Sequence, residues 1–270
     1  MDVARYADWV TRASMAAGTL GLDGTAWVPV LGLLGEEFAR CMGVRLAGDL
    51  GTLALVTRCD VERVRAAAAA AGRERVEEMT AGVSGEVLFE VRLGRYGLRL
   101  GIERAGGDGP PALVERMRSI AERAELVSDE RRGVVRVWRL GALLPAGAET
   151  GARLAAAMAA GGVEPRQRDY LSGVYPVLSE GAPWVCARVA ATQDGVLPEV
   201  GVSFPGVKED LLLHVWGTLR RGPDLPKRLG TVTGALAVDR ALFEVRVAAG
   251  APDVEATFVM SGSAPPVLGI

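Results

Sequence analysis

The sequence predicts an α+β fold in which an antiparallel sheet closes into a β-barrel, or curves strongly, and is surrounded by helices. Segments that alternate apolar and polar residues occur along much of the chain and are joined by short turns. Helical patterns recur after pairs of these segments, whereas the strand–helix–strand alternation of parallel α/β folds is missing. No linker or change in composition divides the chain, so we expect residues 1–270 to form a single domain.

The first half of the chain contains four helical and four strand-like patterns. Apolar residues at helical spacing predict helices over residues 2–17, 26–42, 61–79 and 112–125. Short apolar or alternating runs predict strands over residues 51–57, 86–93, 97–104 and 133–140. The turn at residues 94–96 joins the second and third of these strands into a hairpin.

The second half continues in the same way. Helices are predicted over residues 148–160 and 208–220, and a less regular stretch containing "SGVYPVL" follows the first of them. Strands are predicted over residues 184–192, 199–204, 230–238, 241–248 and 254–260. The first two of these strands form a hairpin, and so do the third and fourth, which gives a sheet with mostly antiparallel neighbours.

Composition and charge exclude several classes of partner. The formal net charge is −2 at pH 7, so we expect neither a nucleic acid nor an anionic membrane surface to bind. The three cysteines lack metal-ligand spacing and fit reduced thiols. The N-terminus has no signal-peptide pattern, and the longest apolar run is too short to cross a bilayer. A cytoplasmic location is therefore expected.

Several common catalytic motifs are missing from the sequence. His214 is the only histidine, which removes histidine metal clusters and most Ser–His or Cys–His nucleophiles. Neither G-x-G-x-x-G nor G-x-x-x-x-G-K-[ST] occurs, so standard dinucleotide and phosphate loops are unsupported. The sequence identifies no catalytic residue.

Arginines recur on the polar faces of the predicted strands. Each of five strands carries one at a central position of that face: Arg92, Arg99, Arg136, Arg188 and Arg246. If the sheet is open, this face lies in water and Glu/Arg pairs across strands keep it soluble. If the sheet closes, the arginines line a lumen and require anionic partners such as a diphosphate or a carboxylated substrate. The sequence leaves both interpretations open.

The order of elements resembles the soluble aromatic prenyltransferases, whose αββα repeats form a ten-stranded antiparallel barrel surrounded by helices. Residues 16–40, "AAGTLGLDGTAWVPVLGLLGEEFAR", are similar to the opening helix pair of that family. "GVVRVWRL" (133–140) resembles its mid-chain strand with a diphosphate-binding residue. "SGVYPVL" (172–178) is similar to a stretch whose tyrosine contacts the diphosphate, and "TVTGALAVDRALFEVRVAAG" (231–250) resembles the closing hairpin with a phosphate-binding basic residue.

The resemblance implies transfer of a prenyl group from an isoprenyl diphosphate to an aromatic or other electron-rich small molecule in the lumen. The implied diphosphate ligands are Arg136, Tyr175 and Arg246, together with Arg92, Arg99 and Arg188. Trp138 and Trp184 would shield the allyl cation. The strand "GTLALVT" lacks the acidic residue that holds Mg²⁺ in the metal-dependent members, which implies a metal-independent enzyme without a cofactor.

Two other functions fit the same pattern. The first is a non-catalytic binding or assembly protein with an open sheet, either a monomer or a homodimer joined through a strand edge such as residues 254–260. The second is a barrel cyclase or isomerase that uses no diphosphate. Guanidinium groups that converge on one cavity would favour an enzyme, and guanidinium groups spread into solvent would favour a binding protein.

Overall fold

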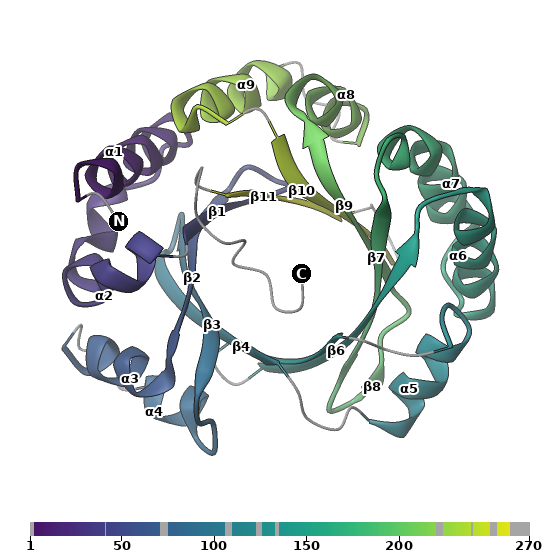
Figure 1. Cartoon of the computed structure of the whole chain (residues 1–270), viewed down its shortest axis with the longest axis horizontal. Helices are drawn as coiled ribbons and strands as arrows, with labels where there is room; N and C mark the ends of the chain where they lie inside the picture. The colour runs from purple at the N-terminus through teal and green to yellow at the C-terminus, as the bar shows by residue number, and fades with distance from the viewer. Residues whose placement is uncertain are drawn as a thin grey trace.

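Strands form a ring at the centre of the molecule and helices surround it (Figure 1). The computed structural model describes residues 3–40, 42–70, 75–105, 110–122, 126–132, 135–219, 224–238, 240–248 and 253–259. The predicted α+β fold, with a strongly curled antiparallel sheet surrounded by helices, is confirmed.

The described strands make one antiparallel sheet in the order β6-β5-β4-β3-β2-β1-β11-β10-β9-β7-β8. Their bounds are β1 Met42–Ala47, β2 Thr52–Asp60, β3 Glu86–Gly94, β4 Gly97–Ala105, β5 Leu126–Arg132, β6 Val135–Pro145, β7 Trp184–Thr192, β8 Gly195–Val196, β9 Val200–Lys208, β10 Arg240–Val247 and β11 Asp253–Val259. Strand β6 also pairs with β7, from Trp138 opposite Ala191 to Pro145 opposite Trp184. This pairing closes the ring. The short strand β8 pairs only with the last two residues of β7, Ala191 and Thr192.

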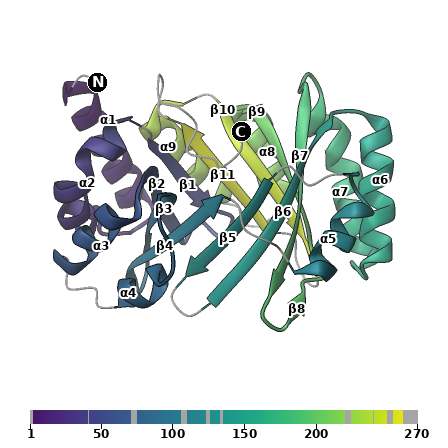
Figure 2. The same cartoon turned by 60° about the horizontal axis from the view of Figure 1, so that its bottom comes forward.

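Helices pack against the outside of the ring, as both views show (Figures 1 and 2). Their bounds are α1 Val3–Thr19, the 3₁₀ helix η1 Gly24–Trp27, α2 Val28–Arg40, α3 Val61–Ala70, α4 Arg75–Thr80, α5 Pro111–Arg118, α6 Ala148–Ala160, α7 Pro165–Ser179, α8 Glu209–Leu219 and α9 Leu225–Leu236. Within the described ranges, no helix is long and apolar enough to cross a bilayer.

The hydrophobic core lies between the outer face of the sheet and the helices. Phe89 on β3, Phe204 on β9 and Phe243 on β10 are fully buried there. Trp216 on α8 packs against Phe243 and donates its indole N–H to the carbonyl oxygen of Gly48 at 3.0 Å. Because successive side chains of a strand alternate, the polar residues of these strands face the lumen.

The structure corrects several predicted elements. Residues 230–238 were predicted to be a strand, but α9 runs to Leu236, since Leu229, Val232 and Leu236 recur at helical spacing and are buried. The irregular stretch around "SGVYPVL" belongs to α7. Strand β11 pairs with β1 on one side and β10 on the other, so residues 254–259 offer no free edge for a dimer.

Candidate functional site

Two matched triplets of residues line the inside of the barrel. Arg45 on β1 and Arg92 on β3 both lie in register with Ala54 on β2, which separates them. On the wall built by β7, β9 and β10, Arg188 and Arg246 lie in register with Gly201 in the same way. In each triplet a small central residue leaves space for two long cationic side chains to approach the same carboxylate.

Glu90 is the carboxylate that both arginines of the first triplet approach. Its Oε1 lies 2.9 Å from Arg92 Nε, and its Oε2 lies 3.7 Å from Arg45 Nη1. The side chain of Glu90 is buried. Its charge is therefore balanced by guanidinium groups and not by bulk water.

Glu244 is the carboxylate that both arginines of the second triplet approach. Its Oε2 accepts hydrogen bonds from Arg188 Nη1 at 2.9 Å and from the Ser203 hydroxyl at 3.1 Å. Its Oε1 lies 3.6 Å from Arg246 Nε. A Cβ on Gly201 would lie 3.3 Å from Glu244 Oε1 and 3.3 Å from Arg246 Cγ, so a larger residue would crowd this cluster.

Glu255 on β11 connects the two triplets. Its carboxylate lies 3.2 Å from Arg45 Nε, 3.7 Å from Arg92 Nη2 and 3.9 Å from Arg246 Nη2. Arg246 Nη2 also lies 2.8 Å from Asp253 Oδ2. We call this continuous set of ion pairs the charge belt; it comprises Arg45, Glu90, Arg92, Arg188, Glu244, Arg246, Asp253 and Glu255.

Charges within the belt shift the pKa values of four of its members. Burial by itself lowers the pKa of a guanidinium, but nearby carboxylates outweigh burial and raise the pKa of Arg45, Arg188 and Arg246. For Glu244, burial acts to raise the pKa, yet Arg188 and Arg246 lower it below its usual value. Burial prevails at Arg139 on β6, whose pKa is lowered although Glu103 and Glu244 oppose that change.

A small cavity adjoins the belt. It measures about 10 Å³ and is lined by Arg45, Glu90 and Glu103, among others. That volume holds about one water molecule.

The barrel also relates this chain to known proteins. No protein-family model matches the sequence, and no curated protein matches it. A solved structure described as "6-dimethylallyl tryptophan synthase" superposes with a TM-score of 0.64 and covers 97% of this chain and 97% of its own. The two chains share the same fold. At 11% sequence identity the likeness establishes the fold alone, and it confirms the predicted resemblance to the αββα aromatic prenyltransferases at that level.

The structure brings three of the predicted site residues together and leaves two more beside them. Arg92, Arg188 and Arg246 belong to the charge belt. Arg99 lies opposite Arg92 on the same face of the sheet but is exposed. Trp184 shares the inner face of β7 with Arg188 and lies opposite Pro145, at the start of the strand.

Arg136 and Trp138 lie on the outer face, so their predicted placement in the lumen is wrong. Arg136 binds the Asp129 carboxylate through Nε at 2.9 Å and Nη2 at 2.7 Å, and its guanidinium carbon lies 4.5 Å from the Trp138 ring centroid. Strand β6 extends to Pro145, beyond the predicted end, and Leu140 is buried in the core. Alternation from Leu140 backward directs Trp138 and Arg136 outward as well.

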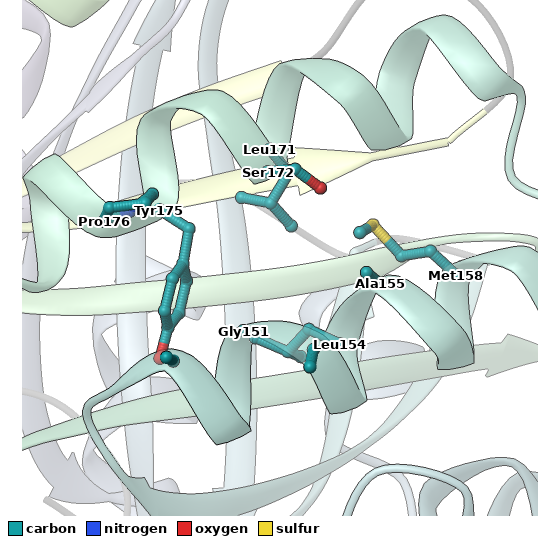
Figure 3. Close-up of a pocket in the computed structure, with 10 residues that line it drawn as sticks. Gly151, Leu154, Ala155, Met158, Leu171, Ser172, Tyr175 and Pro176 are labelled. Atoms are coloured by element: carbon teal, nitrogen blue, oxygen red, sulfur yellow. The ribbon is translucent and has the colours of Figure 1, made fainter.

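Tyr175 also lies outside the barrel, on α7. Its hydroxyl donates to the carbonyl oxygen of Gly147 at 3.2 Å and accepts the Gly147 N–H at 3.3 Å. Figure 3 shows the tyrosine extending from α7 toward the start of α6, beside an apolar groove of about 310 Å³. The residues that line this groove carry no charge, so it offers no group that would hold a diphosphate.

Sequence reasoning did not identify Arg45, Arg139 or the belt carboxylates as site residues. The signal for Arg45 was present, because Val44 and Leu46 alternate with it, but β1 has only 6 residues and was not predicted. Glu90 and Glu244 each share a strand face with an arginine two residues away, Arg92 and Arg246 respectively. Their contacts with Arg45 and Arg188 depend on the strand order, which the sequence does not reveal.

Proposed function

We propose that this protein transfers a prenyl group from an isoprenyl diphosphate to an aromatic or other electron-rich small molecule inside the barrel, without a metal ion. The observation that carries the proposal is the fold, which matches 97% of a chain whose name describes the transfer of a dimethylallyl group. Guanidinium groups on the inner wall add to it, because they are the fixed cations that a departing diphosphate needs.

In this proposal Arg92, Arg188 and Arg246 stabilise the negative charge that develops as the carbon–oxygen bond of the diphosphate breaks. The acceptor ring then attacks the allyl cation in an enclosed space, where water cannot capture it, and loses a ring proton to restore its aromaticity. Arg99 and Trp184 remain proposed contacts on the same inner face, for the diphosphate and for the cation respectively.

The charge belt also bears on the acceptor. Cations and carboxylates alternate along it, so a zwitterion could place its carboxylate at a guanidinium and its ammonium group at a glutamate. Tryptophan, which appears in the name of the matched structure, is a zwitterion with an electron-rich ring. Dimethylallyl diphosphate and tryptophan are therefore the first donor and acceptor to test.

One observation favours a second candidate, in which the barrel binds or converts a small molecule without a diphosphate. The four arginines of the belt each contact a carboxylate of the chain itself. Such pairing balances the charge of these cations without an external anion. A binding protein, or a cyclase or isomerase of another class, would need no free guanidinium.

A thermal-shift measurement with dimethylallyl, geranyl and farnesyl thiodiphosphates separates the two candidates. We expect at least one of them to raise the melting temperature, and Arg246→Ala to abolish the shift. Arg104→Ala is the control, because Arg104 contacts Asp129 on the outer face and should leave the shift intact. Mass spectrometry of a reaction with dimethylallyl diphosphate and tryptophan then tests transfer. Absence of any shift at high ligand excess would favour the second candidate.

A further inference from the structure

We infer that the lumen contains an anion-binding subsite built by Arg188, Ser203 and Arg246, and that the carboxylate of Glu244 occupies it as an internal competitor. A phosphate-bearing ligand would bind this subsite by displacing that carboxylate. The inference rests on the proposed function, because it names the groups that would receive the diphosphate and the group that must first move.

The geometry around Glu244 is that of an anion receptor. Donors from three neighbouring strands converge on one carboxylate: Arg188 at 2.9 Å, the Ser203 hydroxyl at 3.1 Å and Arg246 at 3.6 Å. Guanidinium and hydroxyl donors in this arrangement suit a phosphate oxygen as well as a carboxylate oxygen. The same site can therefore hold either anion.

The donors that a phosphate group would need are already occupied by the Glu244 carboxylate. A single added carbon on Gly201 would lie 3.3 Å from Glu244 Oε1 and 3.6 Å from Arg188 Cβ, so the wall beside the carboxylate is already in close contact. Two adjacent anions in an enclosed lumen would also repel each other strongly. Binding of a phosphate group thus requires the carboxylate to leave.

The groups facing Glu244 keep its carboxylate charged and in place. Arg188 on β7, Ser203 on β9 and Arg246 on β10 contact it directly. Glu255 on β11 and Arg139 on β6 act on it through space, with opposite signs. Because the guanidinium groups together outweigh Glu255 and burial, the carboxylate competes with an incoming anion throughout the neutral pH range.

Isothermal titration with inorganic pyrophosphate tests the inference on the wild type, Glu244→Ala and Glu244→Gln. The alanine variant removes the competing charge and opens space between the donors, so we expect it to bind pyrophosphate at least about tenfold more tightly than the wild type. The glutamine variant removes the charge but keeps the volume, so a smaller gain is expected. Adding Arg188→Met to the alanine variant should cancel the gain.

Loss of a buried carboxylate between two arginines can destabilise the fold. Urea unfolding with increasing pyrophosphate therefore accompanies the titration, and we expect pyrophosphate to restore stability to Glu244→Ala more than it stabilises the wild type. If neither variant binds pyrophosphate more tightly than the wild type, and neither is stabilised by it, the inference is wrong.

The transfer assay keeps this inference separate from the proposed function. If the wild type forms a prenylated product while both Glu244 variants show no gain in pyrophosphate affinity, the transferase proposal stands and the internal competitor is refuted. If the variants gain affinity but neither they nor the wild type form a product with any donor, the subsite stands and prenyl transfer is refuted.

Discussion

Two clusters of the same chemistry lie on opposite faces of the barrel wall. On the inside, Glu244 is held by Arg188 and Arg246. On the outside, Asp129 is held by Arg136, with Arg104 at 3.4 Å. Each cluster joins one carboxylate from the sheet to two arginines, which come from β7 and β10 on the inside and from β4 and β6 on the outside.

The surroundings of the two clusters differ. The side chain of Arg188 is 20% exposed and belongs to a belt that continues along the inner wall, whereas Arg136 is 34% exposed and stacks on a single tryptophan. The carboxylates differ in the opposite sense, since Asp129 is 3% exposed and Glu244 is 13% exposed. Position in the fold, and not the residue pair itself, therefore decides whether an arginine is placed to act on an enclosed ligand.

The largest effect that tests this difference is expected from replacing one arginine in each cluster. Arg188→Met leaves the negative charge of Glu244 with one guanidinium partner instead of two inside the lumen. We expect the free energy of unfolding to fall by about 3 kcal/mol. Arg136→Met leaves the buried Asp129 with Arg104 at 3.4 Å, and a similar fall of about 3 kcal/mol is expected. Urea denaturation at neutral pH measures both values.

Arg153→Met serves as the control for this pair of variants, because Arg153 forms an exposed ion pair with Glu149 on α6 and its loss should change stability little. A loss at Arg188 as small as that of Arg153→Met would show that the barrel does not isolate its inner wall from water. That result would remove the physical basis for treating the lumen as a special site.

The same two clusters show which parts of the fold and site can be predicted from the sequence. Alternation predicts strands on both β6 and β10, and on β10 it correctly groups Phe243 and Val245 against Arg246. On β6 the alternation is equally clear, but an arginine and a tryptophan share one face and the next arginine, Arg139, lies on the other. The face that points outward is decided by Leu140, the last residue of the predicted strand, and by Ala142 and Leu144 beyond its end, all buried in the core.

Strand order is the second feature that could not be predicted from the sequence. The belt forms because β11 lies between β1 and β10, which brings Glu255 near Arg45 and Arg246 although they are far apart in sequence. Neither alternation nor composition encodes that adjacency in a single sequence. The prediction of one domain over residues 1–270, and the roles of Arg92, Arg99, Arg188, Arg246 and Trp184 toward a substrate, remain predictions.

A smaller effect is expected from acid. Since Arg188 and Arg246 lower the pKa of Glu244 in the folded protein, its ion pairs add stability above its ordinary pKa of 4.5. This contribution is lost as the pH falls through the lowered pKa, because the folded state must then accept a proton. The difference in unfolding free energy between the wild type and Glu244→Gln should therefore shrink on acidification from neutral pH, as urea denaturation at several pH values would measure. A difference that stays constant would mean that Glu244 titrates normally and is not held by its neighbours.

The smallest effect is expected outside the barrel, at Tyr175. Tyr175→Phe removes two hydrogen bonds to the backbone of Gly147 but keeps the ring against Phe204, so we expect a loss of about 1 kcal/mol in unfolding free energy. Because the hydroxyl lies at the α6–α7 contact, the thermal shift produced by a thiodiphosphate should be unchanged. If that shift disappears while the variant remains folded, the tyrosine contacts the diphosphate as the resemblance implied. The ligand would then have to reach the outer helices, and the contrast between an enclosed inner cluster and a purely structural outer layer would fail.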